Sequence, residues 1–204
     1  MDLVIISSAI NTCSAPLSYY PIRSVFNKQE RYEQTFKTLD SIRKIPNKRT
    51  YFVECTDIPE YEDSIRTQVD FYKNVYKGNE AVIDGPYKNV GEALSCLAVE
   101  SDEYENIYKI SGRYYLTDEF DYSLWKNDDT MMWVDSNNGW RLTVFYKINK
   151  AQHLQWLCLL MDMVRNNEPR AIEQIMMEIT DFKRIEKVGV EGYSWWWISK
   201  ILIC

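Results

Sequence analysis

The sequence has 204 residues, of which 46% are hydrophobic and 26% are charged, as expected for one globular domain with a buried core. Its formal net charge is −6 and no basic run is longer than Lys48-Arg49, which excludes a protein that follows a nucleic-acid backbone. His153 is the only histidine and the five cysteines form no Cys-x-x-Cys pair, which excludes a zinc site of the usual Cys/His kind.

The N-terminus and the hydropathy pattern predict a protein without a membrane span. Asp2 stands where a signal peptide requires basic residues, and the apolar run that follows it is too short for one. No stretch reaches the roughly 20 apolar residues of a membrane-spanning helix. We therefore expect a cytoplasmic protein with reduced cysteines.

Strand and helix patterns alternate along the first half of the chain. The expected strands are residues 3–6, 50–54, 71–76 and 106–111. Three helices are expected: one begins at the capping pair Asn27 and Glu30 and ends before Pro46, one spans 61–69, and one begins near Asn89. This alternation predicts a mostly parallel sheet with helices on both faces.

The second half of the chain is expected to add a hairpin and two helices. The strands are residues 131–134 and 142–146, and the helices are residues 151–164 and 169–179. Asn137-Asn138-Gly139 is the hairpin turn, and Pro169 suits a first helical turn. The tail contains Trp195-Trp196-Trp197 and ends on an apolar stretch, so the chain is either one domain over 1–204 or the N-terminal part of a longer protein.

Open parallel sheets bind ligands beyond the carboxyl ends of their strands, so the loops at those ends are where a site is expected. These loops are residues 7–10, 54–57, 84–92, 111–113 and 135–139. The stretch from Ser7 to Asn11 contains no glycine, which argues against a dinucleotide-binding fold and against a methyltransferase. Its small residues leave room for a nucleotide base against the backbone.

Glu54 ends the second expected strand, and its sequence position leaves three roles open. It can accept the N3–H hydrogen bond of uracil and repel cytosine, which would make it a base selector. It can bind a ribose, as in a methyltransferase. It can also be a solvated strand end, with Asp57 capping the following helix.

Two of these loops combine basic residues with groups that attract phosphate. Lys88 opens a helix near Asn89, and a helix N-terminus attracts anions through its free N–H groups. Lys109 and Arg113 flank the turn Ser111-Gly112, where buried charge is costly without an anionic partner. Either a diphosphate satisfies both side chains, or they take part in an internal ion pair.

The order of these motifs resembles that of GT-A-type glycosyltransferases of capsule and viral glycan pathways, including enzymes that decorate viral capsids. The matching blocks, within residues 3–148, are Arg23-Ser24, Glu30-Arg31, Gln34-Thr35, Lys88 with Gly91-Glu92, and 109–114. The resemblance implies a GT-A fold, with a central, mostly parallel mixed sheet flanked by helices. It also implies a UDP-sugar donor, a glucose- or rhamnose-type hexose, a glycan or glycoprotein acceptor, and help from Mn²⁺ or Mg²⁺. For a virus-encoded chain, the cytoplasm would be that of the host cell.

The resemblance also implies roles for individual residues. The base and ribose would contact Ser7, Ser8, Ala9, Ile10 and Glu54. The diphosphate would lie near Arg31, Lys88 and Arg113, and the same motifs add Glu92, Lys109, Ser111 and Gly112 to the nucleotide-sugar site.

One stretch departs from the family pattern. Most GT-A enzymes bind a metal ion with Asp-x-Asp at the end of the fourth strand, where this chain has Ser111-Gly112-Arg113. An arginine cannot ligate a cation. Either the metal takes oxygens from elsewhere, with Asp84 and Asp135 as candidates, or the guanidinium partly replaces it.

Two carboxylates are candidates for the base that an inverting transfer requires. Asp135 follows the fifth expected strand, and Glu173 lies in the first turns of a late helix. A helix dipole lowers the pKa of Glu173 and weakens it as a base, so Asp135 ranks first. The alternative to an enzyme is a non-catalytic nucleotide- or sugar-binding module derived from a transferase, which the missing Asp-x-Asp favours.

Overall fold

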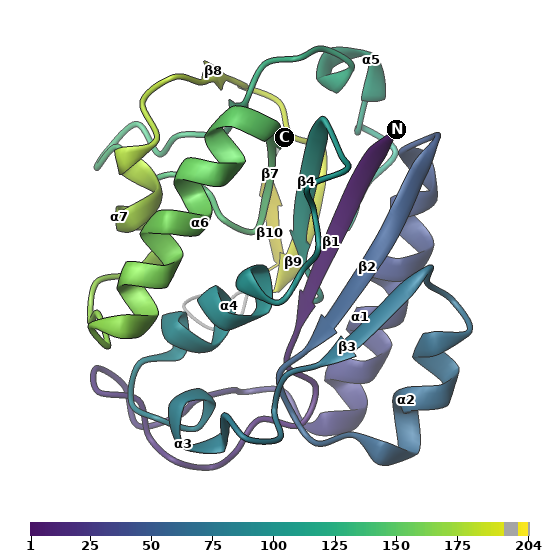
Figure 1. Cartoon of the computed structure of the whole chain (residues 1–204). Coiled ribbons are helices and arrows are strands. Elements are labelled where there is room, and N and C mark those ends of the chain that lie inside the picture. The colour runs from purple at the N-terminus through teal and green to yellow at the C-terminus, as the bar shows by residue number, and fades with distance from the viewer. Residues whose placement is uncertain (194–199, 204) are drawn as a thin grey trace.

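A seven-stranded mixed sheet forms the centre of the computed structural model, which describes residues 1–193 and 200–203 (Figure 1). In sheet order its strands are β3 (Phe71–Asn74), β2 (Lys48–Glu54), β1 (Asp2–Ser8), β4 (Asn106–Ser111), β7 (Phe145–Asn149), β6 (Met131–Met132) and β8 (Lys183–Arg184). The first four strands run parallel to one another, β7 is antiparallel to β4, and β6 is antiparallel to β7. The predicted fold class, a mostly parallel mixed sheet flanked by helices, is confirmed.

Helices cover both faces of this sheet (Figure 1). One face carries α1 (Lys28–Ser41) and α2 (Pro59–Arg66), and the other carries α4 (Lys88–Leu97), α6 (Lys150–Arg165) and α7 (Ile172–Ile175). Alternate residues of β1 pack into two separate cores, Leu3 and Ile5 on the α4 side, Val4 and Ile6 on the α1 side. Burial on both faces explains why β1 is a continuous apolar run.

Short elements complete the fold. They are α3 (Glu80–Ile83), α5 (Tyr122–Trp125) and the 3₁₀ turns η1 (Ile42–Lys44) and η2 (Met176–Glu178). A second, antiparallel sheet has the order β10 (Lys200–Ile203), β9 (Val190–Tyr193) and β5 (Tyr114–Leu116). The sequence did not predict this sheet, because the three residues of β5 form a strand only by pairing with a distant part of the chain.

The N-terminus of α1 has the predicted capping box. The side chain of Asn27 accepts the Glu30 N–H at 2.9 Å, and the Glu30 carboxylate accepts the Asn27 N–H at 2.8 Å. The helix passes into η1 at Ile42 and ends before Pro46, as predicted. The cap fixes where α1 begins, and thereby places the first helical turn beside the end of β1.

The predicted hairpin is present, but its strand limits are wrong. β6 and β7 pair through Met131 and Lys147, and the turn has Gly139 at a φ of +74°. β6 is only two residues long, and β7 starts at Phe145 instead of at 142. β7 ends at Asn149, and the same residue caps the following helix α6, where its side chain accepts the Gln152 N–H at 3.0 Å.

The predicted helix over 169–179 is wrong at its start. The helix α7 begins at Ile172, so Pro169 is not in a first helical turn. The side-chain amide of Asn89 donates to the carbonyls of Glu168 (3.0 Å) and Arg170 (2.5 Å). These bonds hold the segment against the start of α4 and use carbonyls that a helix would need.

Other limits also differ from the prediction, and α2 spans Pro59–Arg66 instead of 61–69. α2 begins at Pro59 with Ile58 at its N-cap position, so Asp57 does not cap it. β3 ends at Asn74, two residues early. The tryptophans at 195–197 lie outside the described residues. None of the helices in the described part of the chain has the length and hydropathy needed to cross a membrane.

Candidate functional site

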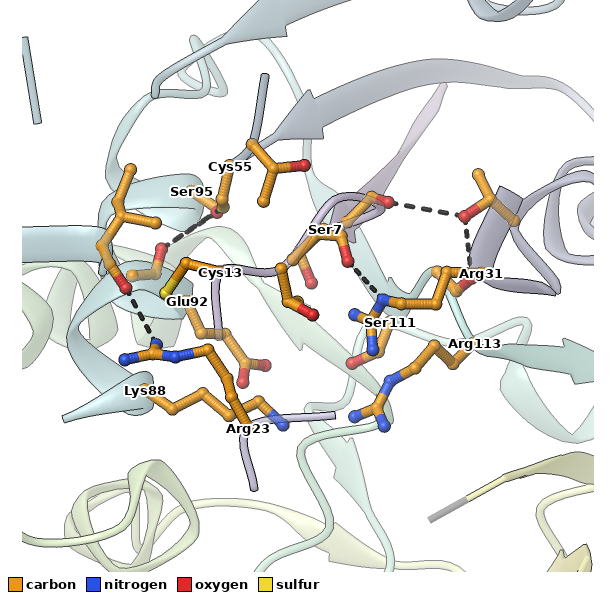
Figure 2. A pocket seen from close by; sticks show the side chains of 18 of the residues that line it. Ser7, Cys13, Arg23, Arg31, Cys55, Lys88, Glu92, Ser95, Ser111 and Arg113 are labelled. Carbon is orange, nitrogen blue, oxygen red and sulfur yellow. Dashed lines mark hydrogen bonds between the residues drawn. The ribbon is translucent and has the colours of Figure 1, made fainter. Parts of the chain in front are cut away.

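A pocket lies at the carboxyl ends of β1, β2 and β4 (Figure 2). Among the described residues, four of the five loops expected to hold a site contribute to its lining, and loop 135–139 does not. The expected residues that line it are Ser7, Ser8, Ala9, Arg31, Lys88, Glu92, Ser111, Gly112 and Arg113. The other three expected residues, Ile10, Glu54 and Lys109, are at most 1% exposed and do not line it.

The pocket is more positive than the protein as a whole. The charged side chains in its described lining are Arg23, Arg31, Lys88 and Arg113 against Asp84 and Glu92. The whole chain has a formal net charge of −6. Figure 2 shows Lys88 and Arg113 pointing toward each other from opposite sides of the pocket. A concave site with this charge favours an anionic ligand.

The turn at 111–113 sits close against β1 because its central residue has no side chain. The Gly112 N–H donates to the Ser7 carbonyl at 2.8 Å, and a Cβ at this position would lie 3.2 Å from Ser8 Cβ and Oγ. Thr35 Oγ1 on α1 donates to the Gly112 carbonyl at 3.1 Å. The turn is thus held from two sides, which fixes where its arginine enters the pocket.

Arg31 lies in the first turn of α1 and is 5% exposed. Its Nε donates to the Ala9 carbonyl at 2.5 Å and its Nη1 to Ser24 Oγ at 3.1 Å. Burial, and then the charge of Arg113, lower its pKa to about 9, against the opposing effect of Glu54. Arg31 therefore remains charged at neutral pH.

Lys88 is the first residue of α4, whose N-cap position has no side-chain cap. Burial, followed by the charges of Arg113 and Arg31, lowers the pKa of Lys88 to about 7. The carboxylates of Glu92 and Glu173 act in the opposite direction. A lysine whose pKa is lowered mainly by burial would gain charge if an anion entered the pocket.

Lys109 forms an internal ion pair, which was the predicted alternative to a contact with diphosphate. Its Nζ donates to the Glu92 carboxylate, to Ser111 Oγ at 2.9 Å and to the Thr143 carbonyl at 2.7 Å. Burial alone would raise the pKa of Glu92, but the charge and hydrogen bond of Lys109 outweigh it and hold this pKa low. Arg113 is not part of this pair and stays directed into the pocket.

Glu54 is fully buried and accepts hydrogen bonds from the protein itself. One carboxylate oxygen accepts the Ile10 N–H at 3.0 Å and the hydroxyl of Thr56. Burial raises the pKa of this carboxyl, although these hydrogen bonds and the charge of Arg31 oppose it. Glu54 is thus not a solvated strand end, and its contacts hold the loop after β1 in place.

Neither candidate base lines the pocket, but the charge of Glu173 acts on the pocket residue Lys88. Asp135 is half-buried and accepts the Asn137 N–H at 2.9 Å, so it shapes its own turn. Glu173 accepts from Thr143 Oγ1 at 2.9 Å, and burial followed by the charge of Glu92 raises its pKa. The predicted lowering of this pKa is wrong, because α7 has only four residues and burial dominates. Glu173 therefore ranks first as a base.

The carboxylates in and near the pocket are engaged in contacts within the protein. The described residues contain no group of three or more Asp, Glu, His or Cys that could hold a metal ion. Glu92 is paired with Lys109, and Asp84 Oδ2 accepts from Tyr76 at 2.8 Å. Asp84 lines the pocket and Asp135 does not, so the two expected ligands do not lie there together.

Several pocket residues were not among the site residues predicted from the sequence, although Arg23, Thr35 and Gly91 belong to the motif blocks that carry the resemblance. They are Thr12, Cys13, Arg23, Thr35, Cys55, Thr56, Ile83, Gly91 and Ser95. Helical spacing was the available signal for two of them, since Thr35 follows Arg31 by four positions and Ser95 follows Glu92 by three. For Arg23 the available signal was its place in the Arg23-Ser24 block. This arginine reaches across the chain to donate to the carbonyls of Ile83 at 3.0 Å and Asp84 at 2.8 Å.

Comparison with known proteins identifies the fold. No family model and no curated protein sequence matches the chain. CTP:phosphocholine cytidylyltransferase (LicC) from Streptococcus pneumoniae superposes with a TM-score of 0.54 at 12% identity, over 94% of this chain and 92% of that one. The glycosyltransferase GlyE from Streptococcus pneumoniae TIGR4 superposes with a TM-score of 0.51 at 14% identity, over 90% of this chain and 44% of that one.

A glycosyltransferase involved in the glycosylation of the major capsid of PBCV-1 superposes with a TM-score of 0.48 at 10% identity, over 86% of this chain and 74% of that one. The chain spans less than half of GlyE and nearly all of LicC. At such low identity a superposition establishes a fold and not a reaction. The fold is that of the nucleotide-diphospho-sugar transferases, the GT-A fold.

Proposed function

We propose that the protein is a glycosyltransferase that moves a glucose- or rhamnose-type hexose from a UDP-sugar to a glycan or glycoprotein acceptor in viral or surface glycan synthesis. The main support is the positive pocket at the carboxyl ends of parallel strands in a nucleotide-diphospho-sugar transferase fold. The choice of UDP, hexose and acceptor rests on the sequence resemblance to enzymes of capsule and viral glycan pathways.

In this proposal two groups of pocket residues bind the two parts of the donor, its diphosphate and its nucleoside. The diphosphate lies between Lys88, Arg113 and Arg31, where charge-assisted hydrogen bonds are strongest. The nucleoside lies against the short side chains and backbone of 7–9, at the end of β1. Because the base-facing part of this lining offers no charged side chain, most of the binding free energy comes from the diphosphate.

Glu173 is the proposed base of an inverting transfer. Burial raises its pKa, which makes its carboxylate a stronger proton acceptor, and Thr143 holds one of its oxygens. The acceptor oxygen bonds to the anomeric carbon, its proton passes to the Glu173 carboxylate, and UDP leaves with the electron pair of the broken bond. The cations around the diphosphate stabilise the charge of this leaving group.

A non-catalytic nucleotide- or sugar-binding module is the alternative function. It is favoured by Ser111-Gly112-Arg113 in place of Asp-x-Asp and by the lack of a metal-binding group among the described residues. This alternative shares the diphosphate contacts with the transferase and differs in the absence of turnover.

We expect UDP to bind the pocket with an affinity that falls as pH rises above about 7. Lys88 is protonated below its pKa of about 7 and neutral above it, and a diphosphate favours the protonated form. The loss is at most about tenfold for each pH unit above 7, since one proton is linked to binding. The ligand's own charge is constant in this range, because a second phosphate pKa lies near 6.

Calorimetric titration of UDP between pH 7 and 9 measures this dependence. Lys88→Arg is the matched control, since it keeps the charge at a higher pKa and should give a nearly flat profile. A flat profile for the unmodified protein would remove Lys88 from the diphosphate site. No UDP binding at any pH would contradict the proposed function.

A further inference from the structure

Two of the pocket's cations have no hydrogen-bond or ion-pair partner in the described part of the chain. In residues 1–193 and 200–203, the side chains of Lys88 and Arg113 form no hydrogen bond and no ion pair. The guanidinium of Arg113 has one weak contact, with the Tyr114 ring, whose centroid is 6.0 Å away. Unpaired cations that repel each other in a half-buried site are costly, and an anion between them would remove this cost.

The carboxylates of the pocket are already engaged. Lys109 neutralises Glu92, and the Tyr76 hydroxyl donates to Asp84 at 2.8 Å. A divalent cation placed here would face four cationic side chains and find one carboxylate without a cationic partner. The charge distribution that suits a diphosphate therefore opposes a metal ion at the same place.

The turn at 111–113 supplies a positive charge in the place of a metal ion. It enters the pocket at the end of β4, and Gly112 and Thr35 fix its position against β1 and α1. It thus presents the guanidinium of Arg113 toward Lys88 (Figure 2). A planar guanidinium binds two phosphate oxygens at once, as a metal ion can.

We infer that the pocket binds the diphosphate of its donor without a divalent cation, and that Lys88, Arg113 and Arg31 supply the required positive charge. The inference rests on the proposed function, because it concerns the diphosphate of the same donor. It makes the enzyme indifferent to chelators, and it assigns leaving-group stabilisation to side chains.

The test is calorimetric titration of UDP into metal-stripped protein, once in EDTA and once with Mn²⁺. Inorganic pyrophosphate in EDTA isolates the diphosphate contribution. We expect the same UDP affinity in both buffers, and losses of roughly 10- to 150-fold in EDTA for Lys88→Ala and for Arg113→Ala. Lys88→Arg keeps the charge and should retain most of the affinity. Arg113→Lys keeps the charge but loses the contact with two phosphate oxygens, so it should retain part of the affinity that Arg113→Ala loses. These variants distinguish lost binding from lost folding.

Two outcomes overturn the inference in different ways. UDP binding that requires Mn²⁺ would show that a metal ion supplies the charge, and it would leave the proposed function standing. No UDP binding in either buffer would remove the proposed function together with the inference.

Discussion

Replacing Arg113 with alanine is expected to weaken UDP binding strongly and to leave uridine binding unchanged. Arg113 is the cation that the turn after β4 directs into the pocket, and none of the described acidic side chains pairs with it. A charge-assisted hydrogen bond contributes about 1.5–3 kcal/mol, or roughly 10- to 150-fold in affinity. Titration of UDP and of uridine into both proteins measures the difference.

The matched control for this variant is Arg43→Ala. Arg43 lies in η1, is 72% exposed and pairs with Asp40, so the same chemical change is made outside the pocket lining. This control should bind UDP like the unmodified protein. Equal losses for uridine and UDP in Arg113→Ala would mean that the arginine supports the structure of the pocket and does not contact phosphate.

Replacing Glu173 with glutamine is expected to lower kcat by about 10²- to 10⁴-fold and to leave UDP affinity unchanged. Glutamine keeps the hydrogen bond to Thr143 but cannot accept the acceptor's proton. Because burial raises the pKa of Glu173, turnover of the unmodified protein should fall as pH decreases through that pKa. Initial rates with a saturating donor measure both effects.

Two control variants sharpen this test. Glu178→Gln changes an acid on the same segment that is 46% exposed and pairs with Arg170 at 3.4 Å, and it should have no effect on turnover. Asp135→Asn changes the other candidate base, whose carboxylate holds its own turn. If Glu173→Gln and Asp135→Asn both turn over normally, neither residue is the base, and a retaining mechanism without an enzymic base explains the reaction better.

Local patterns in the sequence were sufficient to predict the position of the pocket. The apolar run of β1, the capping box at Asn27 and the start of α4 near Lys88 are each determined by residues within one or two turns. A mostly parallel sheet with helices on both faces then follows from the alternation of strands and helices. The loops at the strand ends could therefore be brought together before the structure was known.

Features that depend on distant contacts could not be predicted in this way. β5 exists only by pairing with β9, and Asn89 holds 168–170 out of the helix that Pro169 suggests. The roles of Glu54 and Lys109 depended on burial and on partners from other strands and helices. The pKa of Glu173 was predicted in the wrong direction for the same reason, since burial outweighed the effect of a four-residue helix.

The most direct test of this account is whether the protein removes the sugar from a UDP-sugar. Radiolabelled UDP-glucose and related UDP-hexoses are incubated with the protein, with and without glycan acceptors, and the labelled sugar that leaves the donor is separated and counted. The account predicts transfer, or slow hydrolysis without an acceptor, for at least one UDP-hexose, and a loss of this activity in Glu173→Gln. Tight UDP binding with no release of labelled sugar from any donor would contradict it and identify a non-catalytic nucleotide-binding module.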